Sequence, residues 1–575
     1  MKRQIALLLL LALPAAAQVP YIESMEVRVH NIDVVVTDAK GQPVTNLTRD
    51  DFQLFEDGKE RELSNFSSYA DVARASAREE GRAEARPTLQ PAAPPSRKFI
   101  FYVDEMALTQ PTSKKLKAQF DRLFRESMRE GDEAMVVRPH EQEKLRLPFS
   151  SDAAAVQKAL LEALDREKWR ATSPHFLEMR QLGIEMRGAG SWHGRRIAAR
   201  RYANFVKNRV QQRLGQLRAI VNAAAELPGR KVLVLATESM PLEPGKEAFQ
   251  VTDDPVSVQA ADGDSAFGDW SMLDDLTHAD WVNLQPLVDE IARSAATGGV
   301  TIYAVQPEYG IGSLAPGGDI DGPTPGREAW DSGTARRRTA SQPLAGTSGN
   351  PMLVELRATN TEGTLRTLAE KTGGTWHRGA LSFDNLVNEI VADVSSYYSL
   401  GYRAGGDYDT PHKIEVRVKG RPDLHVRARK EVIRKSPERE MTDRVVASLL
   451  APPSRGEVPV RVEYKTVGTD RKTQTMWVAA HVPLSALSFL PDGNTLKASF
   501  SVHYAVAGEQ SDFTSGVHGT QVVEVPQADA ENIRTGHWTY VIPLNMNRAK
   551  YTVAVGVMDT LSHAAGFGKV EVRAE

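Results

Sequence analysis

The chain contains no cysteine among its 575 residues. This absence excludes disulfide bonds, zinc centres with thiolate ligands, thiol nucleophiles and a lipid-modified cysteine near the N-terminus. Stability must therefore come from ordinary hydrophobic cores, which a chain of this length supplies. Typical domain sizes predict about three or four domains.

Long hydrophobic runs are missing as well, since no segment reaches the ~18 apolar residues that a spanning helix needs. The first residues instead show the three parts of a secretory signal peptide: basic Lys2 and Arg3, the apolar run 5–13, and the small-residue cleavage site 15–17. A retained membrane anchor is the alternative interpretation. We predict a signal peptide at 1–17 and a mature protein exported to the bacterial periplasm or cell surface, without an integral membrane segment.

Neither sign of charge dominates, because 71 Lys+Arg against 74 Asp+Glu give a net charge of −3. An exported chain of nearly neutral charge is not expected to bind nucleic acid. Common enzyme motifs are also absent from the sequence, namely His-Glu-x-x-His, Gly-x-Ser-x-Gly and the Walker lysine motif. We therefore predict no catalytic residues and no enzymatic activity.

The most informative segment that is present is the apolar and aromatic run 99–103, which ends in Asp104 and Glu105. Such a run indicates a strand buried on both faces of a parallel sheet. Similar runs at 231–236 and 300–305 alternate with helical patterns, which predicts an α/β fold with a doubly wound, mostly parallel sheet. Ligands of such sheets bind at the carboxyl ends of the strands, so Asp104 marks a candidate site.

The regions on either side of this α/β pattern show short alternating strands separated by turn residues, which favours β structure. The predicted organisation is a signal peptide (1–17), a small β module (22–70), a Pro/Ala-rich linker (71–97), the α/β domain (98–435) with loop insertions near 241–285 and 307–350, and a C-terminal β-sandwich (457–575).

Four pieces occur in order along residues 22–435: Asn46-Leu-Thr-x-Asp-Asp-Phe-x-Leu-x-Glu-Asp-Gly58, the strand ending at Asp104, Gly229-Arg-Lys-Val-Leu-Val-Leu235, and Ser395-Ser-Tyr-Tyr-Ser-Leu-Gly-Tyr402. Together they resemble the VWFA-related domain family of exported bacterial proteins, named from Acidobacteria. The resemblance implies a von Willebrand factor type A-like domain behind a small β module. Most members of that family lack an assigned activity.

The resemblance also implies a place for a divalent cation. In von Willebrand A domains, Asp-x-Ser-x-Ser after the first strand, a threonine from a later loop and an aspartate after the fourth strand hold Mg²⁺. Asp104 matches the first ligand and Glu238 falls near the last, but Met106 and Leu108 stand at the serine positions. These two side chains offer no hard oxygen, which Mg²⁺ requires. The site is therefore degenerate: either Mg²⁺ or Ca²⁺ is still bound, or the edge works without metal through Asp104, Glu105 and Glu238.

Two charged segments leave alternatives open. The basic stretch 195–213 has the spacing of an amphipathic helix. Its basic face is either solvated, or binds an acidic partner, or pairs with the acidic insertion near 241–285 of the same chain. That insertion contains Asp262-Gly-Asp264, a spacing typical of calcium loops, without the closing glutamate of an EF-hand. A solvated loop is the simpler interpretation.

These observations favour an exported, non-enzymatic protein that binds another protein or a surface polymer through the top of the α/β sheet. The alternative is a structural component of a cell-envelope assembly that retains no ligand site. Partner identity is not encoded in any recognisable motif.

Overall fold

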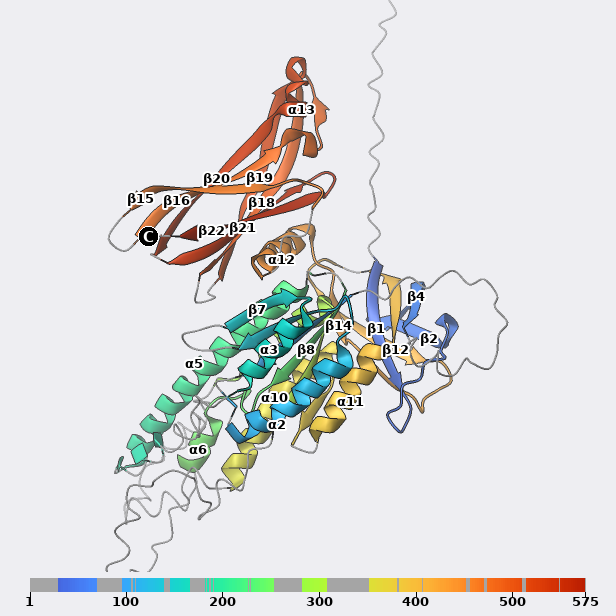
Figure 1. Ribbon diagram of the computed structural model, residues 1–575, viewed down its shortest axis with the longest axis vertical. Coiled ribbons are helices and arrows are strands. Elements are labelled where there is room, and N and C mark those ends of the chain that lie inside the picture. The colour runs from blue at the N-terminus through green and yellow to red at the C-terminus, as the bar shows by residue number, and fades with distance from the viewer. Residues whose placement is uncertain are drawn as a thin grey trace, which may run out of the picture.

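The computed structural model describes the chain from residue 29 to residue 573, with gaps, and Figure 1 shows how its parts are arranged. The predicted signal peptide, nearly all of the linker, and most of both insertions lie outside the described residues. The described residues are 29–69, 96–104, 107–108, 110–138, 145–165, 181–182, 184–185, 188–189, 191–225, 227, 229–252, 282–307, 351–379, 382–405, 407–450, 456–469, 473–508, 513–547 and 549–573.

The α/β domain is built on a six-stranded sheet in the order β10-β9-β8-β5-β6-β7. All neighbouring strands run parallel except β7, which pairs antiparallel with β6 at one edge. Strands β5 and β8 are buried along their whole length, as the apolar runs predicted. The strands are β5 (Arg97–Val103), β6 (Glu133–Arg138), β7 (Leu145–Ser150), β8 (Arg230–Ala236), β9 (Val300–Gln306) and β10 (Trp376–Arg378).

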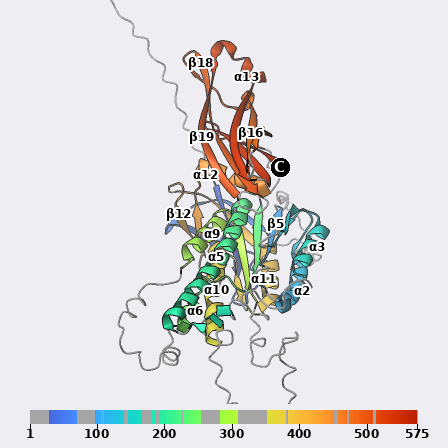
Figure 2. The same cartoon turned by 90° about the vertical axis from the view of Figure 1, so that its left-hand side faces the viewer.

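Helices cover both faces of this sheet, so two separate apolar cores form, one on each side (Figure 2). One face carries α2 (Gln110–Ser127), α3 (Ala153–Ala163) and α11 (Ser382–Ser395), and the other carries α5 (Trp192–Ala225), α9 (Gln285–Thr297) and α10 (Pro351–Thr372). The short helix α6 (Lys246–Thr252) packs against α5. Residues near 241–285 were expected to be a loop, and α6 corrects that expectation for its own residues.

The N-terminal β module is larger than the sequence suggested, because strands from two distant parts of the chain form it. Its two sheets have the orders β13-β1-β11-β4 and β14-β12-β2-β3, and a shared apolar core lies between them. Residues 397–433 were assigned to the α/β domain, but their four strands pair in this module instead. Its elements are β1 (Val29–Thr37), the 3₁₀ turn η1 (Arg49–Asp51), β2 (Phe52–Glu56), β3 (Lys59–Arg61), β4 (Leu63–Tyr69), β11 (Tyr397–Arg403), β12 (Pro411–Val418), β13 (His425–Ala428) and β14 (Glu431–Ile433).

The α/β domain is therefore inserted between the two halves of the β module, and a buried polar cluster joins the two. Arg427 of β13 forms a two-pronged ion pair with Asp393 of α11, at 2.8 and 2.7 Å. The Tyr303 hydroxyl of β9 donates to the same carboxylate at 2.8 Å. Arg427 also lies 3.2 Å from Glu389, one helical turn before Asp393. Burial raises the pKa of Asp393 even though Arg427 opposes the shift.

The C-terminal region folds as two facing antiparallel sheets with an apolar core between them. One sheet has the order β15-β16-β20, and the other contains β17, β18, β21 and β22, with β19 also paired to β18. The elements are β15 (Arg461–Thr469), β16 (Thr473–Pro483), η4 (Leu484–Ala486), β17 (Leu490–Asp492), β18 (Thr495–Gly508), β19 (Phe513–Pro526), η5 (Gln527–Asp529), α13 (Asn532–Thr535), β20 (His537–Asn547), β21 (Lys550–Asp559) and β22 (Ala565–Arg573).

Helix α12 (Pro437–Leu450) is the joint between this sandwich and the rest of the chain (Figure 1). It contacts α5 of the α/β domain and also packs on β18, β21 and β22. Its buried side chains Met441 and Val445 form a small apolar core with Phe567 of the sandwich. Beside that core lies His503, which is fully buried, with its Nδ1 3.0 Å from the Thr442 hydroxyl and its Nε2 3.1 Å from the Ser501 hydroxyl.

The buried imidazole makes the joint sensitive to acid. Burial lowers the pKa of His503 to about 4, against an ordinary value of 6.5. The unfolded chain therefore binds a proton that the folded chain excludes, and the stabilisation present above pH 6.5 is lost as the pH falls towards 4.

Replacing this ring should reduce the pH dependence of stability. Between about pH 7 and pH 4, the free energy of unfolding of the unaltered chain should fall by on the order of 2 kcal/mol more than that of His503→Gln. Urea unfolding of both proteins at each pH measures the difference. His481→Gln is the matched control, since that ring lies on the sandwich surface with 31% of its side chain exposed. Identical pH dependence of the unaltered and His503→Gln proteins would contradict the expectation.

Candidate functional site

The structure places Asp104 and Glu238 at the same edge of the α/β sheet. Asp104 directly follows β5, Glu238 follows β8 by two residues, and these strands are parallel neighbours with Val103 paired to Ala236. Both residues are fully buried. Leu108 is fully buried too, whereas the predicted residues Glu105 and Met106 lie outside the described residues.

Asp104 is neutralised from within the chain. Its Oδ2 accepts a hydrogen bond from Arg213 Nη1 at 2.8 Å and from the Thr237 hydroxyl at 2.7 Å. Its backbone carbonyl accepts the N–H groups of Ala107 and Leu108, both at 3.1 Å. The carboxylate thus has a guanidinium counter-charge, and the backbone after β5 is tied back to it.

Arg213 reaches this position from α5, where it lies among buried apolar residues of the helix face that packs on the sheet. The same Nη1 also donates to the carbonyl of Ser239 at 2.8 Å, so the guanidinium links the segments that follow β5 and β8. Its own backbone carbonyl lies 3.4 Å from the Tyr102 hydroxyl. Burial raises the pKa of that hydroxyl well above its ordinary value.

The donor set at this edge does not fit Mg²⁺ or Ca²⁺. Leu108 supplies no oxygen, and Arg213 brings N–H groups and a positive charge to the oxygen of Asp104 that a cation would need. Within the described ranges, no group of three or more His, Cys, Asp or Glu residues is arranged to hold a metal ion. Oδ1 of Asp104 is buried and has no hydrogen-bond partner among the same described residues.

Sequence reasoning missed Arg213 and Thr237. The signal for Arg213 was present, because Val210, Leu214 and Leu217 surround it at helical spacing and place it on the inward face of α5. A charged residue on such a face requires a buried partner, and Asp104 was the acid already assigned to the adjoining sheet edge. Thr237 was included in the segment around Glu238 but was given no role.

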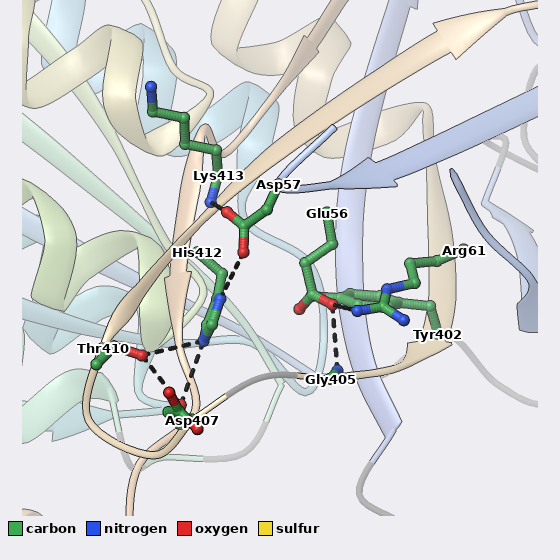
Figure 3. Close-up of polar contacts among 9 residues, drawn as sticks. All are labelled: Glu56, Asp57, Arg61, Tyr402, Gly405, Asp407, Thr410, His412 and Lys413. Atoms are coloured by element: carbon green, nitrogen blue, oxygen red, sulfur yellow. Dashed lines mark hydrogen bonds and ion pairs between the residues drawn. The ribbon is translucent and has the colours of Figure 1, made fainter. Parts of the chain in front are cut away.

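A second polar cluster lies in the β module, at the turn between β2 and β3 (Figure 3). Asp57 occupies the left-handed region in this turn, with φ of 51°, and its Oδ1 accepts the backbone N–H of Lys413 at 2.8 Å. Its Oδ2 lies 2.8 Å from Nδ1 of His412, whose Nε2 is 3.2 Å from the Thr410 hydroxyl. The order carboxylate, imidazole, hydroxyl is that of a nucleophile relay.

The hydrogen bonds of this cluster favour a structural clamp over a relay. The hydrogen bond to Asp57 raises the pKa of His412, and the same contact lowers the pKa of Asp57. A charged imidazole donates from both nitrogens, and Nε2 faces the carbonyl of Asp407 at 3.2 Å, where the Thr410 hydroxyl also donates at 3.1 Å. Because both ring nitrogens face oxygen acceptors, the arrangement favours a ring that donates twice over one that accepts a proton from Thr410.

Beside the clamp, the buried carboxylate of Glu56 closes the same end of the module (Figure 3). It pairs with Arg61 at 2.8 Å and accepts from the Tyr402 hydroxyl at 3.2 Å and from the Gly405 N–H at 3.1 Å. Burial and the Glu56 charge raise the pKa of Tyr402. Together the two clusters fasten the β2–β3 turn to β11 and to the segment before β12.

Comparisons with known proteins leave the identity of the chain open. No family model matches it, and no curated protein matches it. Similar solved structures include the conserved hypothetical protein BatB from Bacteroides thetaiotaomicron, at 12% identity and a TM-score of 0.22 over 52% of this chain and 99% of that chain. They also include an aerotolerance-related membrane protein from Bacteroides fragilis NCTC 9343 with multiple mutations to serines, at 11% identity and a TM-score of 0.21 over 51% of this chain and 98% of that chain.

No helix in the described part of the chain is long and apolar enough to cross a membrane.

Proposed function

We propose that this chain is an exported, non-enzymatic binding or scaffold protein whose α/β domain is von Willebrand A-like and independent of metal. The observation that carries the proposal is the buried ion pair between Asp104 and Arg213 at the carboxyl edge of the sheet. In this interpretation the guanidinium supplies, permanently, the positive charge that a bound cation supplies in an adhesive A domain.

The strand order supports the A-like interpretation. A central strand that is followed by an aspartate and has parallel neighbours on both sides agrees with the mostly parallel sheet that the resemblance implies. Helices on both faces complete a doubly wound arrangement (Figure 2).

Asp104 and Glu238 would act indirectly. Neither side chain has exposed surface, so contact with a partner would fall to the backbone and side chains that follow β5 and β8. We propose that Asp104, through Arg213, holds these segments in one conformation, and that Glu105 belongs to the contacting surface. Pre-organised segments bind with a smaller loss of conformational entropy, which favours a role in recognition.

The structural alternative is favoured by the joints between the parts. The Asp393–Arg427 cluster fastens the α/β domain to the β module, and α12 fastens it to the sandwich. Buried ion pairs and apolar cores at both joints suit a protein that holds partners at fixed distances. The clamp at His412 fits this alternative as well, since its hydrogen bonds secure a turn.

Metal addition tests the proposal directly. We expect the melting temperature of the mature protein to be the same in Mg²⁺, Mn²⁺, Ca²⁺ and EDTA, because Arg213 already neutralises Asp104. We also expect the same envelope proteins to be captured by the immobilised chain in Mg²⁺ and in EDTA. A melting temperature raised by Mg²⁺ and returned to its metal-free value by Asp104→Asn would contradict metal independence. Capture abolished by EDTA would contradict it too.

A further inference from the structure

Helix α5 has an unusual charge pattern, because its 34 residues include no aspartate or glutamate. Buried Arg213 is committed to Asp104, and Arg218 at the other end of the helix pairs with Glu290 of α9 at 3.3 Å. The helix carries eight basic residues, which are Arg195, Arg196, Arg200, Arg201, Lys207, Arg209, Arg213 and Arg218. Such a helix is a strong local source of positive potential in a chain whose net charge is −3.

The face of α5 that points away from the sheet also exposes apolar side chains. Ile197 and Phe205 are 44% and 50% exposed. Arg201 lies between them with 69% of its side chain exposed, and its Nη1 pairs with Glu185 at 3.2 Å. A spacing of four residues places these three side chains on one face of the helix. The guanidinium of Arg209 lies over the Phe205 ring at 5.6 Å, which extends the face by another turn. This basic face, residues 197–209, therefore offers both charge and apolar surface.

The segment 253–281 of the same chain has the complementary composition. It contains no lysine or arginine, and it includes the aromatic residues Phe267, Trp270 and Trp281. Its eight acidic residues are Asp253, Asp254, Asp262, Asp264, Asp269, Asp274, Asp275 and Asp280. The segment thus carries eight negative charges and no positive ones, whereas α5 carries basic residues and no acidic ones.

Both ends of this segment are anchored beside α5. Helix α6 ends at Thr252 and is held to α5 by the hydrogen bond from the Tyr202 hydroxyl to Glu247, at 2.9 Å. Helix α9, which begins at Gln285, packs along α5 and pairs with it through Glu290. Tethering at both ends gives the segment an effective concentration of roughly millimolar at the helix surface.

We propose that the basic face of α5 is the docking surface for the acidic segment 253–281 of this chain. Aspartates of the segment pair with Lys207 and Arg209 and share Arg201 with Glu185, and the aromatic side chains of the segment cover Ile197 and Phe205. The occupant is intramolecular, so the basic face is shielded from other anions at low ionic strength. This inference is independent of the proposed function, which rests on buried Arg213 on the inward face of α5 and not on the exposed face.

The absence of cysteine permits a direct test in the full-length mature chain. In the variant Asn208→Cys/Ser271→Cys, one thiol lies on the exposed face of α5 and the other lies in the acidic segment. The control Lys158→Cys/Ser271→Cys places the first thiol on α3, across the sheet, at a side chain that is 77% exposed. Under mild oxidation we expect about tenfold more intramolecular disulfide in the first variant than in the control.

Salt and charge reversal complete the test. In about 1 M NaCl, where the screening length falls to about 3 Å, the yield of the first variant should drop towards that of the control. Adding Arg201→Glu and Arg209→Glu should lower it at low salt as well, with the melting temperature showing that the chain still folds. Equal yields in the two cysteine pairs would overturn the proposal. Disulfides formed only between molecules would overturn it too, by showing that the occupant is another copy.

Discussion

Replacing Arg213 by methionine is expected to lower the free energy of unfolding by about 3–5 kcal/mol, because the change leaves the fully buried Asp104 carboxylate without a counter-charge. Methionine keeps much of the length of the arginine side chain, so the effect reports the lost charge and hydrogen bonds more than a cavity. The measurement is urea unfolding followed by circular dichroism, with α/β-domain signals resolved from those of the β-sandwich where the transitions separate.

The matched control is Arg218→Met on the same helix. Arg218 pairs with Glu290 through side chains that are 42% and 55% exposed, so its loss should cost no more than about 1 kcal/mol. The double variant Asp104→Asn/Arg213→Met removes both charges and should recover part of the lost stability. Equal effects of Arg213→Met and Arg218→Met would show that the Asp104 pair does not hold the sheet edge.

Arg427→Met is expected to have an effect of similar size at the joint between the α/β domain and the β module. It removes the two-pronged partner of Asp393, which is 1% exposed, and also the counter-charge of Glu389. Glu389 keeps its contact with His377 at 2.8 Å, so the main effect is the loss of the counter-charge of buried Asp393, which should cost about 3–5 kcal/mol. Because β13 and α11 belong to different structural units, we expect the loss to appear as an earlier, separate melting step in calorimetry.

Arg421→Met is the control for this prediction. Arg421 pairs with Asp423 on the surface, where the two side chains are 50% and 58% exposed, and its loss should cost no more than about 1 kcal/mol. A single melting transition in Arg427→Met, at the temperature of the unaltered protein, would show that the Asp393 cluster does not couple the two units.

Local sequence patterns predicted the parts of the fold that depend on local chemistry. A strand that is buried on both faces of a sheet needs apolar residues on both faces, so the apolar runs before Asp104 and Glu238 predicted buried strands. The two runs are neighbouring parallel strands in the structure. The alternating pattern after residue 457 corresponds to two facing antiparallel sheets. Placement of both acids at one sheet edge followed from strand direction alone.

The contacts between distant segments could not be predicted in this way. The strands at 397–433 look like a continuation of the α/β domain in sequence, and only long-range pairing, such as Val34 with Tyr398, assigns them to the β module. The ion pair of Asp104 with Arg213 also joins residues from separate elements. The sequence predicted that Asp104 contacts a partner or a cation. In the fold, its carboxylate pairs with Arg213 of the same chain.

The split β module has a consequence for how the chain acquires its structure during synthesis. Strands β1 to β4 emerge first, but β1 and β4 flank β11 and must wait for residues that follow the whole inserted α/β domain. Until then their backbone donors and acceptors remain open to pairing with other chains. Completion of the module therefore requires closure of a very long loop, which slows folding and prolongs the time in which the early strands are open to aggregation.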